Sequence, residues 1–126
     1  MENIVNEICN KLDDLNLSIK NNYLSKKIIL MAINSIKDFI KLEINPFIEF
    51  SLIKDTFVNL VIGEYLQLIK SANLETDLNL DKAIKSIKEG DTSITYFEKG
   101  NISLDDIIQY FLNKKRLLYN FKRIVW

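Results

Sequence analysis

The sequence predicts a mainly α-helical protein, a small bundle of about four helices with one β-hairpin inserted before the last helix. Apolar residues recur at intervals of three and four over long stretches of the 126-residue chain, which is the spacing of amphipathic helices. The chain contains only one proline and three glycines. Between residues 83 and 97 the pattern changes to the period of two that is typical of strands.

The first two predicted helices cover residues 2–15 and 25–44. In the first, one apolar stripe is expected, with Cys9 half-buried beside it; the stripe consists of Ile4, Val5, Ile8, Leu12 and Leu15. The second should begin with Ser25 as its N-cap. It should end near Ile44, because Pro46 disfavours helical conformation at the residue before it.

The third predicted helix, from about residue 48 to residue 70, is apolar on nearly all sides. Such a helix belongs either in the centre of a core or in a contact between subunits. Gly63 lies in its middle, where a glycine costs about 1 kcal/mol relative to alanine. Two interpretations of Gly63 remain open: it permits the close approach of another backbone, or it is simply tolerated in a well-packed helix.

A polar linker is expected at residues 71–82, followed by a hairpin with strands at 83–88 and 92–97 and a turn at Gly90. An isolated hairpin is marginal in water. It should therefore either cover the core of its own chain or offer a strand edge to a neighbouring molecule. The last predicted helix, residues 103–118, starts at Ser103, with Asp105 and Asp106 in its first turn.

Composition argues against an enzyme. Lysine and arginine total 17 and the acids total 17, so no net charge draws the chain to nucleic acid or to a membrane. The sequence has no histidine, so neither a histidine-activated nucleophile nor a histidine metal ligand is available, and no cofactor or metal is expected. One cysteine indicates a reducing compartment, and neither a signal peptide nor a membrane span is recognisable.

The C-terminal run KKRLLYNFKRIVW, residues 114–126, contains five cations and no acid. Both arginines of the chain lie in it, interleaved with Tyr119, Phe121 and Trp126. It is either the solvated basic end of a helix or a docking tail, since tryptophan, tyrosine and arginine dominate binding hot spots.

The order of these elements, together with the string SIKEGDTSIT and the basic aromatic end, resembles the small head–tail connector (adaptor) proteins of tailed phages and prophages of low-GC Gram-positive bacteria. The resemblance implies a single connector domain over residues 1–126 with 114–126 as its docking tail. It also implies a virion protein, made in the cytoplasm of the bacterial host, that forms a twelvefold ring in the neck.

In that family the ring lies beneath the portal protein, extends the channel through which DNA passes, and presents a surface to the next neck or tail-terminator protein. The residues that would dock on the portal are Arg116, Tyr119, Phe121, Lys122, Arg123 and Trp126. The residues expected between subunits are Ile87, Ile94 and Tyr96.

The alternative is a cytoplasmic helical regulator or antitoxin-like binding module whose basic tail contacts nucleic acid or protein. No helix-turn-helix spacing stands out, and phosphate binding normally needs more cations on one face.

Overall fold

The computed structural model describes residues 2–90 and 102–122, and these residues are mainly helical, as predicted. Five α-helices have nine residues or more: α1 (Glu2–Asp14), α2 (Asn22–Phe39), α3 (Lys54–Ser71), α4 (Leu80–Gly90) and α5 (Leu104–Leu112). A short helix, α6 (Lys115–Leu118), follows α5. A π-helical turn (Ile40–Ile44) extends α2, and 3-10 turns lie at Phe50–Leu52, Glu75–Asp77 and Tyr119–Phe121.

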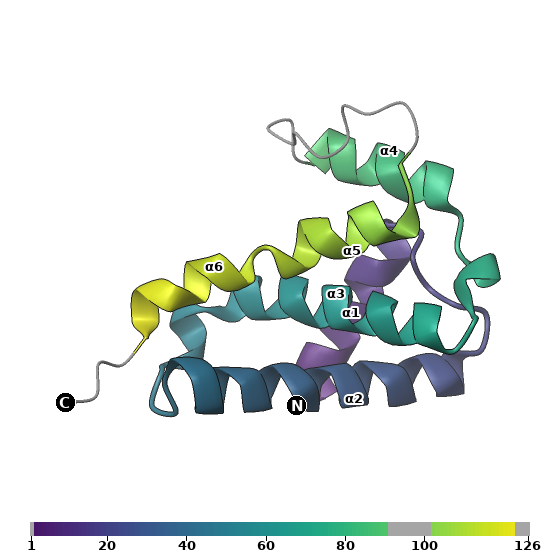
Figure 1. Cartoon of the computed structure of the whole chain (residues 1–126). Coiled ribbons are helices and arrows are strands. Elements are labelled where there is room, and N and C mark those ends of the chain that lie inside the picture. Colours follow the sequence, from purple (N-terminus) through teal and green to yellow (C-terminus); the bar gives the residue numbers. More distant parts are fainter. Residues whose placement is uncertain (1, 91–101, 123–126) are drawn as a thin grey trace.

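The bundle is organised around α3. This helix lies between α2 and α5 and runs antiparallel to both, while α1 crosses behind it (Figure 1). It also contacts α6. Its buried residues include Phe57, Val58, Leu60 and Ile62, which lie on more than one side of the helix. Of the two places predicted for this all-round apolar helix, the structure therefore gives it the centre of the core.

The side chains of α5 pack closely against Gly63 of α3. A Cβ atom built on Gly63 would lie 2.7 Å from Leu112 Cδ2 and 3.0 Å from Phe111 Cβ, both shorter than an ordinary contact. The close-approach interpretation of this glycine is therefore supported, although the groups that approach it are side chains rather than a backbone.

Two helix starts differ in how well the sequence predicted them. Ser103 caps α5 as expected: its side chain accepts a hydrogen bond from Asp106 N, and Asp106 accepts in return from Ser103 N, which completes a capping box. Helix α2 starts earlier than predicted. Asn21 is its N-cap and accepts from Leu24 N at 3.0 Å, so Ser25 lies inside the first turn and is buried.

The prediction of a strand at residues 83–88 was wrong, because these residues belong to α4. Ala83 and Ile87 are buried and lie four residues apart, and Leu80 and Ile84 pack beside them, which is helical spacing. Asn79 Oδ1 accepts from Lys82 N at 3.1 Å and caps this helix. The predicted linker 71–82 therefore contains the 3-10 turn Glu75–Asp77 and the start of α4. The second predicted strand, 92–97, lies outside the described residues.

Candidate functional site

The site is built by the corner between α2 and α3. The π-helical turn ends at Ile44, and Asn45 has an extended backbone (φ −166°, ψ 116°), the conformation that a residue before proline favours. Asn45 N still donates to Ile40 O at 2.8 Å. The proline break that the sequence predicted is thus confirmed, and after Pro46 the chain needs the 3-10 turn Phe50–Leu52 to return to the start of α3.

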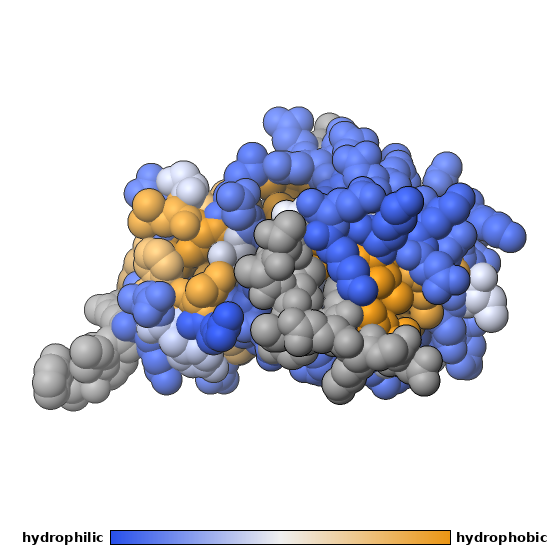
Figure 2. Space-filling view, turned by 90° about the horizontal axis from the view of Figure 1, so that it is seen from above, coloured by the Kyte–Doolittle hydropathy of each residue, from blue (hydrophilic) through white to orange (hydrophobic). Residues whose placement is uncertain are grey.

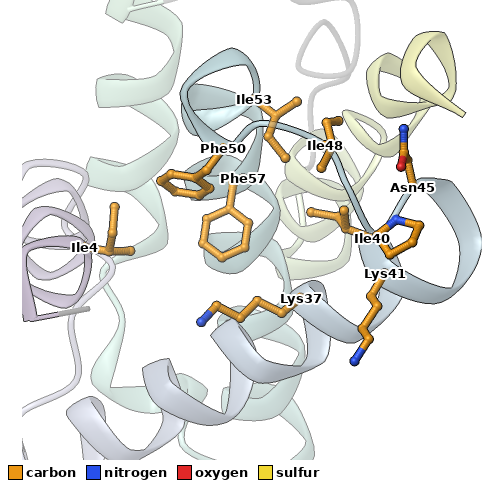
Figure 3. Close-up of a pocket in the computed structure, with 10 residues that line it drawn as sticks. Ile4, Lys37, Ile40, Lys41, Asn45, Ile48, Phe50, Ile53 and Phe57 are labelled. Carbon is orange, nitrogen blue, oxygen red and sulfur yellow. The ribbon is translucent and has the colours of Figure 1, made fainter.

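A pocket of about 430 Å³ opens at this corner (Figure 3). We call it the corner pocket; its lining residues are Ile4, Lys37, Ile40, Lys41, Asn45, Pro46, Ile48, Phe50, Ile53 and Phe57. They come from α1, α2, the π-helical turn, the connecting segment and α3. The lining is mostly apolar, includes two lysines, and contains no acid. A pocket of this size and composition is typical of a binding site.

Large apolar side chains are exposed along the same stretch of chain. Leu42 is 78% exposed, Phe47 77%, Leu52 64% and Phe50 40%. We call these four residues the apolar end. Each either lines the corner pocket or is next to a lining residue in the sequence. Figure 2 shows hydrophobic surface at the end of the molecule that carries α6. Exposed large apolar side chains that gather in one part of a molecule mark candidate interaction sites.

The C-terminal segment lies against this corner. Asn45 Nδ2 donates to Phe121 O at 3.3 Å, while Asn45 Oδ1 accepts from Phe47 N at 2.9 Å. Lys115 Nζ lies 4.7 Å from the centroid of the Phe39 ring. Leu118 is fully buried. The single Asn45 side chain therefore joins the corner pocket to the segment that the sequence predicted as a docking tail.

The predicted docking residues fall into three groups. Arg116, Tyr119 and Lys122 are exposed, and Lys122 Nζ lies 5.6 Å from the centroid of the Tyr119 ring. Phe121 is half-buried, packed against the core. Arg123 and Trp126 lie outside the described residues. The first part of the predicted tail is thus folded onto the body, because α6 and the 3-10 turn Tyr119–Phe121 continue the bundle.

The predicted contact between subunits placed Ile87 on a strand. In the structure Ile87 is 3% exposed and packs in the core of its own chain, so its side chain is not free to meet another subunit. This is a correction of the strand-based assignment. Ile94 and Tyr96 lie outside the described residues.

Titratable groups with shifted pKa values lie elsewhere in the fold. Burial raises the pKa of the half-buried Cys9 thiol and that of the Tyr65 hydroxyl. Burial also lowers the pKa of Lys11, whose Nζ donates to Asn59 Oδ1 at 2.8 Å. None of these groups lines the corner pocket. Its lining offers apolar side chains for packing and the ammonium groups of Lys37 and Lys41.

Metal ligands and membrane spans can be assessed for the part of the chain that the structure describes. That part contains no group of three or more cysteine, aspartate or glutamate side chains placed to hold a metal ion. None of its helices combines the length and the apolar character needed to span a bilayer.

Sequence reasoning did not find the corner pocket. The run LEINPFIEF contains most of its connecting segment, but the pattern does not say that Phe57 is buried while Phe47 is exposed. That difference depends on the path of the chain after Pro46, which brings Ile4 of α1 beside the corner.

Comparison with known protein families, with curated proteins and with solved structures finds no match for this chain.

Proposed function

We propose that this chain is a structural virion protein, a head–tail connector whose copies form a twelvefold ring beneath the portal. The observation that carries the proposal is the gathering of exposed apolar and cationic side chains at one end of the bundle: the apolar end, Lys37, Lys41, Arg116 and Lys122. A monomer rarely keeps such a surface unless a partner covers it. The resemblance in the sequence names the class of partner.

In this proposal the C-terminal segment docks on the portal protein. Arg116, Lys122 and Arg123 meet carboxylates or carbonyl oxygens, and Tyr119, Phe121 and Trp126 supply apolar anchors. Arg116 is exposed and has no ion pair among the described residues. The opposite surface of the ring receives the next neck or tail-terminator protein. The absence of net charge suits a channel through which DNA slides, because a strongly basic lumen would hold it.

The mass of the purified particle, measured by native mass spectrometry, tests the ring. A large oligomer that co-purifies with virions supports the proposal, whereas a monomer or dimer at all concentrations rejects it.

Docking is tested separately by attachment to DNA-filled heads. Arg116→Glu with Lys122→Glu should abolish attachment and leave the particle mass unchanged. The matched control, Lys85→Glu with Lys88→Glu, changes two exposed lysines of α4 by the same charge and should attach normally. Equal attachment of both variants would place docking elsewhere.

The runner-up, a cytoplasmic regulator that binds nucleic acid or protein through its basic end, is favoured by the same exposed Arg116 and Lys122. It predicts a monomer or dimer that retards DNA in a gel, and the Arg116→Glu, Lys122→Glu variant would lose that retardation.

A further inference from the structure

The corner pocket contains a charge pattern that the proposed docking tail does not explain. Lys37 and Lys41 lie one helical turn apart at its edge. Both side chains are exposed, and among the described residues neither ammonium group has an ion pair or a hydrogen-bond partner. The other polar lining residue, Asn45, already bonds within the chain. The pocket thus offers two uncommitted cations beside an apolar floor.

The apolar floor is fixed in the free chain. Ile40, Ile53 and Phe57 are buried in the core, and the rings of Phe50 and Phe57 pack edge-to-face with centroids 5.1 Å apart. Pro46 and the hydrogen bonds of Asn45 hold the opposite wall. A ligand would find these walls in place, so little ordering opposes its entry.

The surroundings indicate an occupant larger than a small molecule. Phe47, Leu42 and Leu52 stay exposed outside the pocket, and a ligand confined to about 430 Å³ would leave them in water. A flat anionic membrane fits less well, because Glu43 and Glu49 are exposed on the same corner and would meet it too. A polypeptide segment, in contrast, can carry carboxylates at the positions that face Lys37 and Lys41 and uncharged residues at the positions that face Glu43 and Glu49.

We propose that the corner pocket binds a leucine or phenylalanine side chain of a partner protein, in a segment where carboxylates flank that side chain. The apolar side chain enters between Ile4, Phe50 and Phe57, while the carboxylates pair with Lys37 and Lys41. This inference deepens the proposed docking role and depends on it for the class of partner, a protein. It adds a second contact, separate from Arg116 and the C-terminal segment.

The test uses the full chain and three synthetic peptides. The first carries Leu-Phe flanked on each side by Glu-Asp, the second carries Leu-Phe flanked by lysines, and the third carries Ala-Ala flanked by Glu-Asp. Binding is followed by amide NMR spectra. The first peptide should shift the amides of the pocket residues, and the other two should bind about tenfold or more weakly, since both the apolar anchor and the charges contribute.

Charge reversal gives the decisive arm. Lys37→Glu with Lys41→Glu should lose about tenfold in affinity for the acidic peptide and gain affinity for the lysine peptide. Lys85→Glu with Lys88→Glu is the control, with the same change of charge on α4, and should keep the original preference. Ile4→Phe narrows the pocket and should weaken the binding of the acidic peptide. The circular dichroism of this variant should match that of the unaltered chain, which shows that the helices still form.

Two results would overturn the inference. One is equal binding of the acidic peptide to the charge-reversed variant and to the control. The other is binding to phosphatidylglycerol vesicles without any binding of the peptide. These measurements need neither a ring nor a portal, so a negative result rejects only the proposal that the pocket binds an acidic segment. A native mass that corresponds to a monomer rejects the proposed connector function and does not affect the peptide result.

Discussion

Replacement of Gly63 by alanine tests the packing of α3 against α5. The new Cβ would lie 2.7 Å from Leu112 Cδ2 and 2.9 Å from Leu112 Cγ, whereas carbon atoms pack best at about 3.5–4.0 Å. Phe111 Cβ, at 3.0 Å, is close to its backbone and can move little. Side chains or helices must therefore shift by about 0.5–1 Å to accept the methyl group.

Two effects of opposite sign set the size of the change. Alanine is favoured over glycine inside a helix by about 1 kcal/mol. Overpacking a core typically costs about 1–3 kcal/mol. We expect Gly63→Ala to lower the free energy of unfolding by about 1 kcal/mol, since Leu112 is only half-buried and can turn partly aside. Urea unfolding followed by circular dichroism measures this, with the slope against urea unchanged.

A double variant separates the two effects. In a Leu112→Ala background the closest contacts of the new methyl group are gone, and only Phe111 Cβ still crowds it. Gly63→Ala should then be neutral or stabilising, so the two changes should be coupled by at least about 1 kcal/mol. A stabilising Gly63→Ala in the otherwise unaltered chain would refute the close approach of α5.

Three further predictions concern single side chains. Ser103→Ala removes the capping box with Asp106 and should cost about 1 kcal/mol in urea unfolding; no loss would mean that the cap does not form in solution. Asn45→Ala removes the bonds to Phe121 O and Phe47 N, so it should cost about 1–2 kcal/mol and speed hydrogen exchange at the Phe47 amide, and unchanged exchange would argue against this link. Burial raises the pKa of Tyr65 above its usual 10.0, so the folded state holds this proton more tightly than the unfolded state. The contribution of this pKa shift to the free energy of unfolding is complete below pH 10 and is lost as the pH rises through the folded pKa. Tyr65→Phe should flatten this alkaline fall in stability, and identical pH profiles of the variant and the unaltered chain would exclude a role for Tyr65.

The sequence predicted those helices whose apolar spacing is long and unambiguous. The segment that became α3 was recognised from its all-round apolar pattern, although the helix starts at Lys54 and not near residue 48 as predicted. The cap of α5 was recognised from Ser103 followed by two acids. The segment that became α4 was misread because Ala83, Lys85 and Ile87 alternate over a few residues, while Leu80 and Ile84 were not counted with them. A short amphipathic run fits a period of two and a period of 3.6 about equally well, and burial against the rest of the fold decides between them.

The candidate site was predictable only where charge and aromatic side chains cluster in the sequence. The basic aromatic C-terminal run was visible, but its attachment to Asn45, which is 76 residues before Phe121, was not. The corner pocket is a property of tertiary structure, since Ile4 and Phe57 meet there from helices at different places in the chain. A local sequence pattern cannot predict a contact between residues so far apart in the chain.

The folding of the C-terminal segment up to Lys122 changes the expected strength of docking. An unstructured tail would lose about 1–2 kcal/mol of backbone entropy for each residue ordered on binding. Residues of α6 and of the turn Tyr119–Phe121 are already helical, so docking through them avoids that cost. Covering Phe47 and Leu52 would contribute up to about 1.5–3 kcal/mol each.

These gains still stand against about 4–15 kcal/mol for bringing two molecules together. One copy should therefore hold its partner weakly, through the pocket and the C-terminal segment combined. In a ring, the first contact places every other copy beside its own site, and linked sites raise the overall affinity steeply without any new contact. If the proposed ring forms, the protein should thus bind firmly as an assembly and weakly as a single chain, whereas the alternative, a monomeric regulator, would bind no more tightly than one copy.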